Sequence, residues 1–93
     1  MIRSFGDKET EKNFHQEFLK KFPPGIQSRA LIKILLIENA EMEEDLRTPL
    51  SNDFEHLRGN RKDFCSIRIN KQWRIIFRFS QGNCFDVSIV DYR

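Results

Sequence analysis

The sequence is poor in cysteine and has no long apolar run. Its 93 residues include two cysteines, Cys65 and Cys84, which are too few for a disulfide framework and match no zinc-binding spacing. We therefore expect two reduced thiols in or near the core of a cytosolic protein. The longest aliphatic stretch covers only residues 34–37, and no basic and apolar leader opens the chain. These absences predict a cytoplasmic protein that does not span a membrane.

Several familiar catalytic signatures are absent as well. The chain has no glycine-rich phosphate loop, no nucleophile elbow and no pair of zinc-binding histidines on a helix. Near its most basic segment the closest acids are Asp63 and Asp86, and nothing there resembles a cage of carboxylates around a divalent cation. We therefore predict a protein that uses neither a metal nor a cofactor.

The sequence does contain enough apolar material for a core. Hydrophobic residues make up 39% of the chain and include nine phenylalanines, so a folded chain is expected. The length is that of one domain, and no repeat or linker divides it. We predict a single domain over residues 1–93.

Charge is distributed unevenly along the chain. Residues 1–46 hold seven Lys and Arg against nine Asp and Glu, whereas residues 47–93 hold nine against five. Between residues 58 and 78, seven basic residues stand against Asp63 alone. These seven are Arg58, Arg61, Lys62, Arg68, Lys71, Arg74 and Arg78. Such a segment either forms a solvated basic face or binds a phosphate-rich partner, and charge alone does not decide between them.

The first half of the chain has the pattern of two helices. Over residues 7–22, phenylalanine recurs at every fourth position from 14 to 22 (Phe14, Phe18 and Phe22), and Asp7 is a suitable helix cap. The proline pair at 23–24 ends this helix, and Pro24 can begin a second one over residues 24–39. That second helix has a broad apolar face, so we expect it to pack on both the first helix and a sheet.

The remaining segments predict strands and loops. Residues 1–5 alternate between apolar and polar and predict an edge strand. The acidic stretch 38–47 is expected to be a solvated helix end or a short extra helix, and residues 48–53 a loop. The second half of the chain alternates with period two, which predicts strands over residues 54–57, 64–70, 73–79 and 84–92.

Two helices on one face of a small, mainly antiparallel sheet make an α+β fold. We expect the other face of this sheet, with Arg68, Arg74 and Tyr92, to be open. His56 lies two residues before Arg58, so in an extended segment both would project from one face. The alternative for His56 is an ordinary surface histidine, which is also our reading of His15.

A group of arginines with a tyrosine, and with a histidine or glutamate nearby, suits a reaction in which the substrate supplies its own nucleophile. RNA does so through its 2′-hydroxyl, which attacks the adjacent phosphate and leaves a cyclic phosphate and a 5′-hydroxyl. The protein then has to supply fixed cations for the pentacoordinate phosphate, a base and an acid. Tyr92 would stack on a base or hold a phosphate.

The same residues carry a resemblance to a known family. The stretches "MIRSFGDKETEKNF", "LRGNRKDFCSIRINKQWRIIFRF" and "DVSIVDY" resemble the HigB branch of the RelE-type bacterial toxins, the plasmid-maintenance killer proteins, over essentially the whole chain. The resemblance implies a RelE-like fold and a small cytoplasmic endonuclease that cuts mRNA in the ribosomal A site. It also implies silencing by a HigA-like helix-turn-helix antitoxin, through which alone the toxin would meet operator DNA.

Carried over by position, the resemblance points to particular residues. Arg58 and Arg74 match positions that act in catalysis or phosphate binding in the family, and Tyr92 matches a contributing tyrosine near the C-terminus. Arg61 and Arg68 occupy positions that are usually basic and are assigned to RNA binding. To these the basic segment adds Lys62, Lys71 and Arg78.

The end of the chain departs from the family. Relatives commonly end in Asp-Tyr-His, with the histidine as candidate base or acid, whereas this chain ends in Asp-Tyr-Arg93. Arginine stays protonated and is a poor base. Either His56 or Glu55 takes the role, or Arg93 only clamps phosphate in a slow enzyme, or the molecule is catalytically crippled.

Two rival functions stand beside the endoribonuclease. The first is a non-catalytic protein that keeps the fold and the antitoxin surface and binds RNA without cutting it. The second is a DNA-binding module in its own right, which is the weaker of the two because neither predicted helix is basic on one face.

Overall fold

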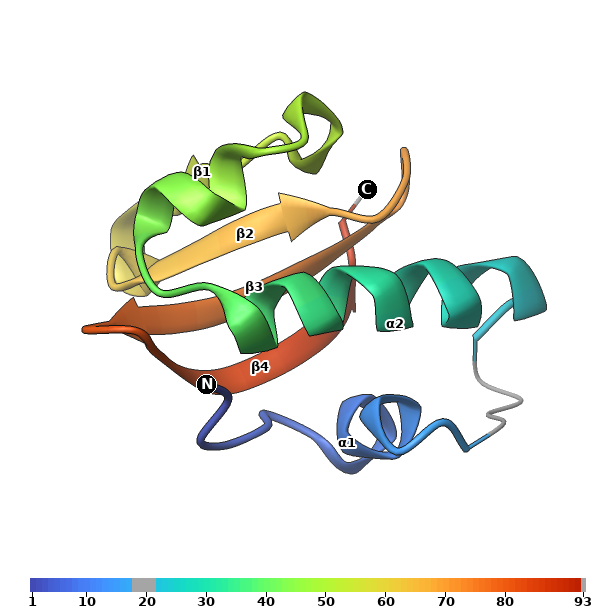
Figure 1. Cartoon of the computed structure of the whole chain (residues 1–93). Helices are drawn as coiled ribbons and strands as arrows, with labels where there is room; N and C mark the ends of the chain where they lie inside the picture. Colours follow the sequence, from blue (N-terminus) through green and yellow to red (C-terminus); the bar gives the residue numbers. More distant parts are fainter. Residues whose placement is uncertain (18–21, 93) are drawn as a thin grey trace.

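Four antiparallel strands in the order β1-β2-β3-β4 form one sheet, and helix α2 lies across one of its faces (Figure 1). The computed structural model describes residues 1–17 and 22–92. Its helices are α1 (Lys8–Phe14) and α2 (Pro24–Asn39), and its strands are β1 (Glu55–His56), β2 (Phe64–Arg68), β3 (Trp73–Ser80) and β4 (Asn83–Asp91). Short 3₁₀ helices occupy Glu43–Arg47, Leu50–Asn52 and Gly59–Arg61. The α+β class predicted from the sequence is confirmed.

Helix α1 is shorter than the sequence predicted. It begins at the Asp7 cap, whose carboxylate accepts a hydrogen bond from the Thr10 backbone N–H at 2.7 Å. It ends at Phe14 because Gln16 has a positive φ of 64°, and the amides of Gln16 and Glu17 close a Schellman motif on earlier carbonyls. The predicted extent of 7–22 is therefore wrong, and its residues 18–21 lie outside the described residues.

The segment before α1 and helix α1 itself attach to the outer edge of β4. Residues 1–5, predicted to be an edge strand, form only two isolated parallel bridges, between Ile2 and Cys84 and between Phe5 and Val87. Thr10 is fully buried, and its hydroxyl accepts a hydrogen bond from the Ile89 backbone N–H at 2.9 Å. The backbone groups on the outer edge of β4 thus find hydrogen-bond partners in the N-terminal segment and in the Thr10 side chain.

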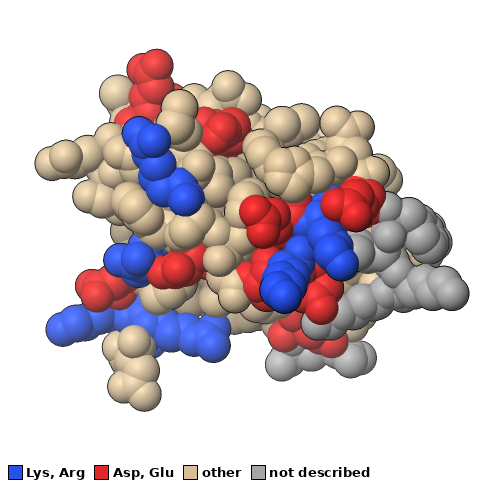
Figure 2. All heavy atoms as spheres, turned by 90° about the horizontal axis from the view of Figure 1, so that it is seen from below, with Lys and Arg blue, Asp and Glu red and all other residues tan. Residues whose placement is uncertain are grey.

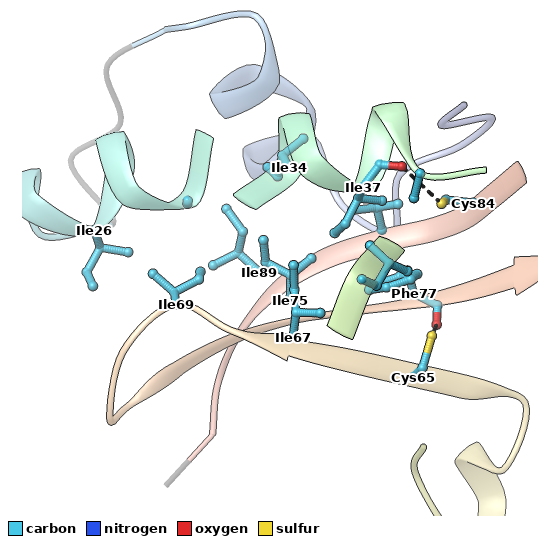
Figure 3. Close-up of a cluster of buried hydrophobic side chains, with 14 of the residues drawn as sticks. Ile26, Ile34, Ile37, Cys65, Ile67, Ile69, Ile75, Phe77, Cys84 and Ile89 are labelled. Carbon is cyan, nitrogen blue, oxygen red and sulfur yellow. Dashed lines mark hydrogen bonds between the residues drawn. The ribbon is translucent and has the colours of Figure 1, made fainter. Parts of the chain in front are cut away.

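Helix α2 has the bounds that the sequence predicted and carries one side of the core. Pro24 occupies its first position, where a missing N–H costs no hydrogen bond. Its buried residues face the sheet, and Figure 3 shows Ile26 lying over Ile69 and Ile37 on the side of the helix that faces Ile75 of β3. The 3₁₀ helix after it buries Leu46 completely, so the acidic stretch forms the short extra helix rather than a wholly solvated end.

Both cysteines are free and buried in this core, as predicted. Cys65 lies on β2 and Cys84 on β4, on either side of Phe77 (Figure 3). Burial raises the pKa of the Cys65 thiol to about 12 and that of the Cys84 thiol to about 11. Both thiols therefore stay protonated at neutral pH.

In the hairpin of β2 and β3, the side chains point to the two faces of the sheet as the sequence predicted. Arg68 lies directly opposite Arg74, and Ser66 opposite Ile76, so these four side chains share the face away from α2. A β-bulge at Asp86, with φ of 55°, shifts the pairing of β3 and β4 between Ile76 and Arg78. Within the described ranges, no helix is both long and apolar enough to cross a membrane.

Candidate functional site

A hollow of about 380 Å³ lies beside β1, and we call it the β1 hollow. Its lining comes from β1, from the 3₁₀ turn after β1 and from the end of β4. The lining residues are Glu55, His56, Leu57, Arg58, Arg61 and Tyr92. The hollow therefore brings together predicted catalytic residues that are more than thirty positions apart in the sequence.

The cations of the β1 hollow are free to meet a ligand. Arg58 and Arg61 are exposed, and neither takes part in an ion pair within the part of the chain that the structure describes. Gly59 between them has a positive φ of 70°, which glycine adopts without strain and which sets the tight turn. The turn thereby carries two unpaired guanidinium groups into the same hollow.

Arg74 lies behind this hollow and is buried, so the expectation of an open face is wrong for this residue. Only 6% of Arg74 is exposed. Its Nε donates to the Ser66 hydroxyl at 2.9 Å, and its terminal nitrogens reach Asp53 Oδ2 at 3.1 Å and Glu55 Oε1 at 3.2 Å. The guanidinium group is thus held rigidly, but two carboxylates balance its charge.

Tyr92 extends this arrangement toward solvent. The Arg74 guanidinium lies 5.6 Å from the centre of the Tyr92 ring, which is within the range of a cation–π contact. The Tyr92 backbone N–H donates to the Gln72 carbonyl at 2.6 Å, which ties the end of β4 to the β2–β3 turn. Tyr92 is 46% exposed, so part of this residue remains available to a ligand.

Glu55 and His56 point to opposite sides of β1. Glu55 pairs with Ser66, on the face of Arg74, whereas His56 pairs with Cys65, on the core face. The His56 imidazole binds Glu43 Oε1 at 3.0 Å and stacks edge-on against Phe54. Of the two candidate bases, Glu55 is the one whose side chain meets Arg74.

The Glu43 carboxylate that holds His56 belongs to the 3₁₀ helix over residues 43–47. Burial alone would raise the pKa of Glu43, but hydrogen bonds from His56 and Arg47 outweigh it and lower that pKa below its ordinary value. Glu43 is therefore ionised at neutral pH and fixes the orientation of the imidazole at the rim of the β1 hollow.

The remaining predicted RNA-binding residues do not form one patch. Arg68 and Lys71 line a second hollow at the β2–β3 turn, and Lys62, which follows Arg61 in the chain, is exposed. Arg78 lies toward the other end of β3, where its Nη2 pairs with Asp86 at 2.9 Å. Arg93, which was predicted to be a catalytic residue, lies outside the described residues.

Comparison with known proteins gives a family. The sequence model described as "RelE-like toxin of type II toxin-antitoxin system HigB" matches residues 3–93. The chain belongs to this family of HigB-like toxins. It is 40% identical over 83 residues to Toxin HigB-1 of Vibrio cholerae, covering 88% of this chain and 87% of that protein. It is also 32% identical over 62 residues to an uncharacterized protein of Haemophilus influenzae, covering 67% of this chain and 61% of that protein.

Membership establishes that this HigB-like toxin is part of a type II toxin–antitoxin system and so has an antitoxin as partner. The resemblance stated from the sequence motifs is confirmed. In the described part of the chain, no group of three or more His, Cys, Asp or Glu side chains is placed to hold a metal ion.

Sequence reasoning missed the acidic partners of Arg74 and two basic residues of α2. Asp53 was assigned to a loop without a role, yet its αL backbone (φ of 45°) turns its carboxylate toward Arg74. Arg29 and Lys33 of α2 line the second hollow together with Arg68. The spacing of Arg29 and Lys33, four residues apart on one helix, was the available signal.

Proposed function

We propose that this HigB-like toxin is a ribosome-dependent endoribonuclease that cuts mRNA by attack of the 2′-hydroxyl on the adjacent phosphate. The observation that carries the proposal is the β1 hollow, in which two guanidinium groups without an ion pair in the described chain, a carboxylate and an exposed tyrosine meet. This set supplies fixed cations for a pentacoordinate phosphate, a proton acceptor and a stacking surface for a base.

In this mechanism Glu55 accepts the proton of the 2′-hydroxyl as that oxygen attacks phosphorus. Arg58 and Arg61 stabilise the charge that develops on the non-bridging oxygens, and Tyr92 stacks on a neighbouring base. The bond from phosphorus to the 5′-oxygen then breaks, and this oxygen takes a proton from water or from the imidazole of His56. Arg74 acts behind them by holding Glu55 at 3.2 Å.

One observation favours the rival function, a toxin-fold protein that binds RNA without cutting it. Asp53 and Glu55 together balance the charge of Arg74, so this arginine offers a phosphate less positive charge than a free one. The rival and the nuclease differ in one measurable property, which is cleavage of RNA on programmed ribosomes.

The test is single-turnover cleavage of mRNA on ribosomes by the full-length chain. Arg58→Gln should lower the rate about 10²-fold or more through lost electrostatic stabilisation, and Glu55→Gln about 10²–10⁴-fold through lost proton transfer. Lys12→Gln, which removes one exposed cation of α1, is the matched control and should leave the rate unchanged. An mRNA with a 2′-deoxy nucleotide at the cut site should bind but resist cleavage. Absence of cleavage by the unmodified toxin would establish the binding-only rival.

The metal requirement and the chain end are tested in the same assay. Treatment of the toxin with a chelator beforehand should leave cleavage unchanged, and loss of activity that a divalent cation restores would contradict the mechanism. Arg93→His should raise the rate if Arg93 only clamps phosphate, whereas His56→Ala should abolish most activity if His56 exchanges the proton.

We also propose that the antitoxin is a HigA-like helix-turn-helix protein, that the toxin meets operator DNA only through it, and that the pair works in the cytoplasm. Expression of the toxin alone should arrest bacterial growth, and co-expression of such an antitoxin should restore it. Normal growth with soluble toxin present would count against the proposal.

A further inference from the structure

A second hollow, of about 330 Å³, lies between α2 and the β2–β3 turn, and we call it the hairpin hollow. Four of its lining residues are cations, and none is an acid. Two of the cations stand four residues apart on α2 and two come from the hairpin. They are Arg29, Lys33, Arg68 and Lys71.

Among the residues that the structure describes, these four cations have no acidic partner. Within residues 1–17 and 22–92, none of them forms an ion pair, whereas Arg47, Arg74 and Arg78 each do. The Lys33 ammonium donates to the side-chain oxygen of Asn52, which is neutral. Arg68 donates through Nε to the Asn70 carbonyl at 3.0 Å, and its two terminal nitrogens remain without a partner in the same ranges.

Holding these charges together has a cost. Burial lowers the pKa of Lys33, and the nearby charge of Arg29 lowers it further. Like charges at positions i and i+4 of a helix also destabilise it. A bound anion would relieve both effects. Its negative charge favours the charged form of Lys33 and offsets the repulsion between Lys33 and Arg29.

The turn that completes the hairpin hollow is fixed in place. The Asn70 side chain accepts hydrogen bonds from the backbone N–H groups of Gln72 and Trp73, both at 2.8 Å. Lys71 therefore extends from an ordered turn, and Arg68 from the end of β2 just before it. The hydroxyl-bearing Ser51 completes the lining with a further hydrogen-bond donor.

From these contacts we propose that the hairpin hollow binds a backbone phosphate of RNA, at a site separate from the β1 hollow. The proposal rests on the proposed function in naming RNA as the source of the phosphate. The two hollows are close together, because Ser51 lines the hairpin hollow and Glu55, four residues later in the chain, lines the β1 hollow. Four residues span at most about 14 Å of extended chain, so a single RNA strand is long enough to reach both hollows.

The test measures binding without cleavage. Wild-type toxin and Arg29→Gln/Lys33→Gln are titrated with a single-stranded 2′-O-methyl oligoribonucleotide, which lacks the attacking hydroxyl. The double variant should bind about 10-fold more weakly, and its salt dependence should fall by about 0.7 for each lost phosphate contact. Lys8→Gln/Lys12→Gln removes the same charge from exposed positions on α1 and is the control. Equal weakening by both pairs would overturn the proposal.

Two further arms identify the ligand. Inorganic phosphate should shift the amide resonances around Ser51 and residues 68–71, and Lys71→Gln, an exposed turn variant, should weaken RNA binding without a change in fold. A glutamate-rich peptide that competes with RNA at equal charge concentration would assign the hollow to a protein partner and overturn the RNA proposal. If the toxin does not cleave mRNA but the Arg29→Gln/Lys33→Gln effect persists, only the proposed nuclease function fails.

Discussion

At the scale of single residues, Arg74 joins stability and site geometry because its guanidinium group bonds Ser66, Asp53 and Glu55 at once. Arg74→Ala should therefore lower the free energy of unfolding by about 1–3 kcal/mol, since the buried Ser66 hydroxyl and the two carboxylates lose their partner. Urea denaturation measures this change. Arg78→Ala is the control, because its pair with Asp86 is exposed and worth about 0–1 kcal/mol. Equal losses at both positions would show that the buried Arg74 contacts stabilise the fold no more than an exposed ion pair does.

The contact between Glu43 and His56 gives a prediction for pH. Because the pKa of Glu43 is lowered in the folded protein, its contribution to stability is present above the unfolded pKa of about 4.3 and is lost as pH falls through the folded value. Glu43→Gln should thus lower the melting temperature near pH 6 and have little effect well below pH 4. Glu17→Gln, at an exposed position after α1, is the control. A difference that persists unchanged at low pH would contradict this assignment.

At the scale of elements, the close approach of Gly6 to β4 fixes how the N-terminal segment attaches. A Cβ at this position would lie 2.0 Å from the Ser88 hydroxyl oxygen and 3.1 Å from the Asp86 carbonyl oxygen. Gly6→Ala should therefore cost about 1–3 kcal/mol of stability through overpacking, as measured by urea denaturation. Gly25→Ala in α2 meets no atom within 4 Å and should be neutral or stabilise by about 0.4–1 kcal/mol. A neutral Gly6→Ala would mean that residues 1–6 detach easily.

The bounds of a helix or strand could be predicted where the local sequence pattern determines them. Helix α2 and the β2–β3 hairpin follow from proline at the helix start and from strict alternation, and both have close to their predicted bounds. Helix α1 does not, because Gln16 adopts a left-handed backbone conformation that its residue type does not signal. The bridges of residues 2 and 5 depend on the position of β4, more than eighty residues away in the sequence.

For the candidate site, the sequence predicted which residues lie near one another better than it predicted their contacts. Family resemblance pointed to Arg58, Arg61 and Tyr92, and the fold places them around one hollow. The opposite directions of Glu55 and His56 follow only once the register with β2 is known. The pairing of Asp53 with Arg74 joins positions twenty-one residues apart, and no spacing rule connects a loop acid to a strand arginine.

At the scale of the whole molecule, many basic side chains lie beside acidic ones, so the surface is not divided into one basic and one acidic face. Figure 2 shows basic and acidic side chains lying next to one another on the face that includes α1. In the described chain, two groups of cations without an ion pair lie instead at the β1 hollow and the hairpin hollow. The basic segment of the sequence therefore gives two local sites rather than one continuous basic surface.

The two buried cysteines make global unfolding measurable. Cys65 and Cys84 lie on different strands of one core, and their raised pKa values keep the thiols protonated. At about pH 8, a thiol reagent should label both at the same slow rate, because the reactive thiolate forms only when the core opens. Mass spectrometry of the time course separates single from double labelling. Fast modification of one cysteine would show that its strand opens independently.

The attachment of α1 to β4 also determines how this part of the protein fluctuates. Seven residues are too few to hold a helix in water without help, so α1 persists because Thr10 and its neighbours dock on the outer edge of β4. Its amide hydrogens should therefore exchange with solvent through a local opening that leaves the sheet folded. The exchange rate of α1 then measures the free energy of docking, and any partner that covers this edge will slow it.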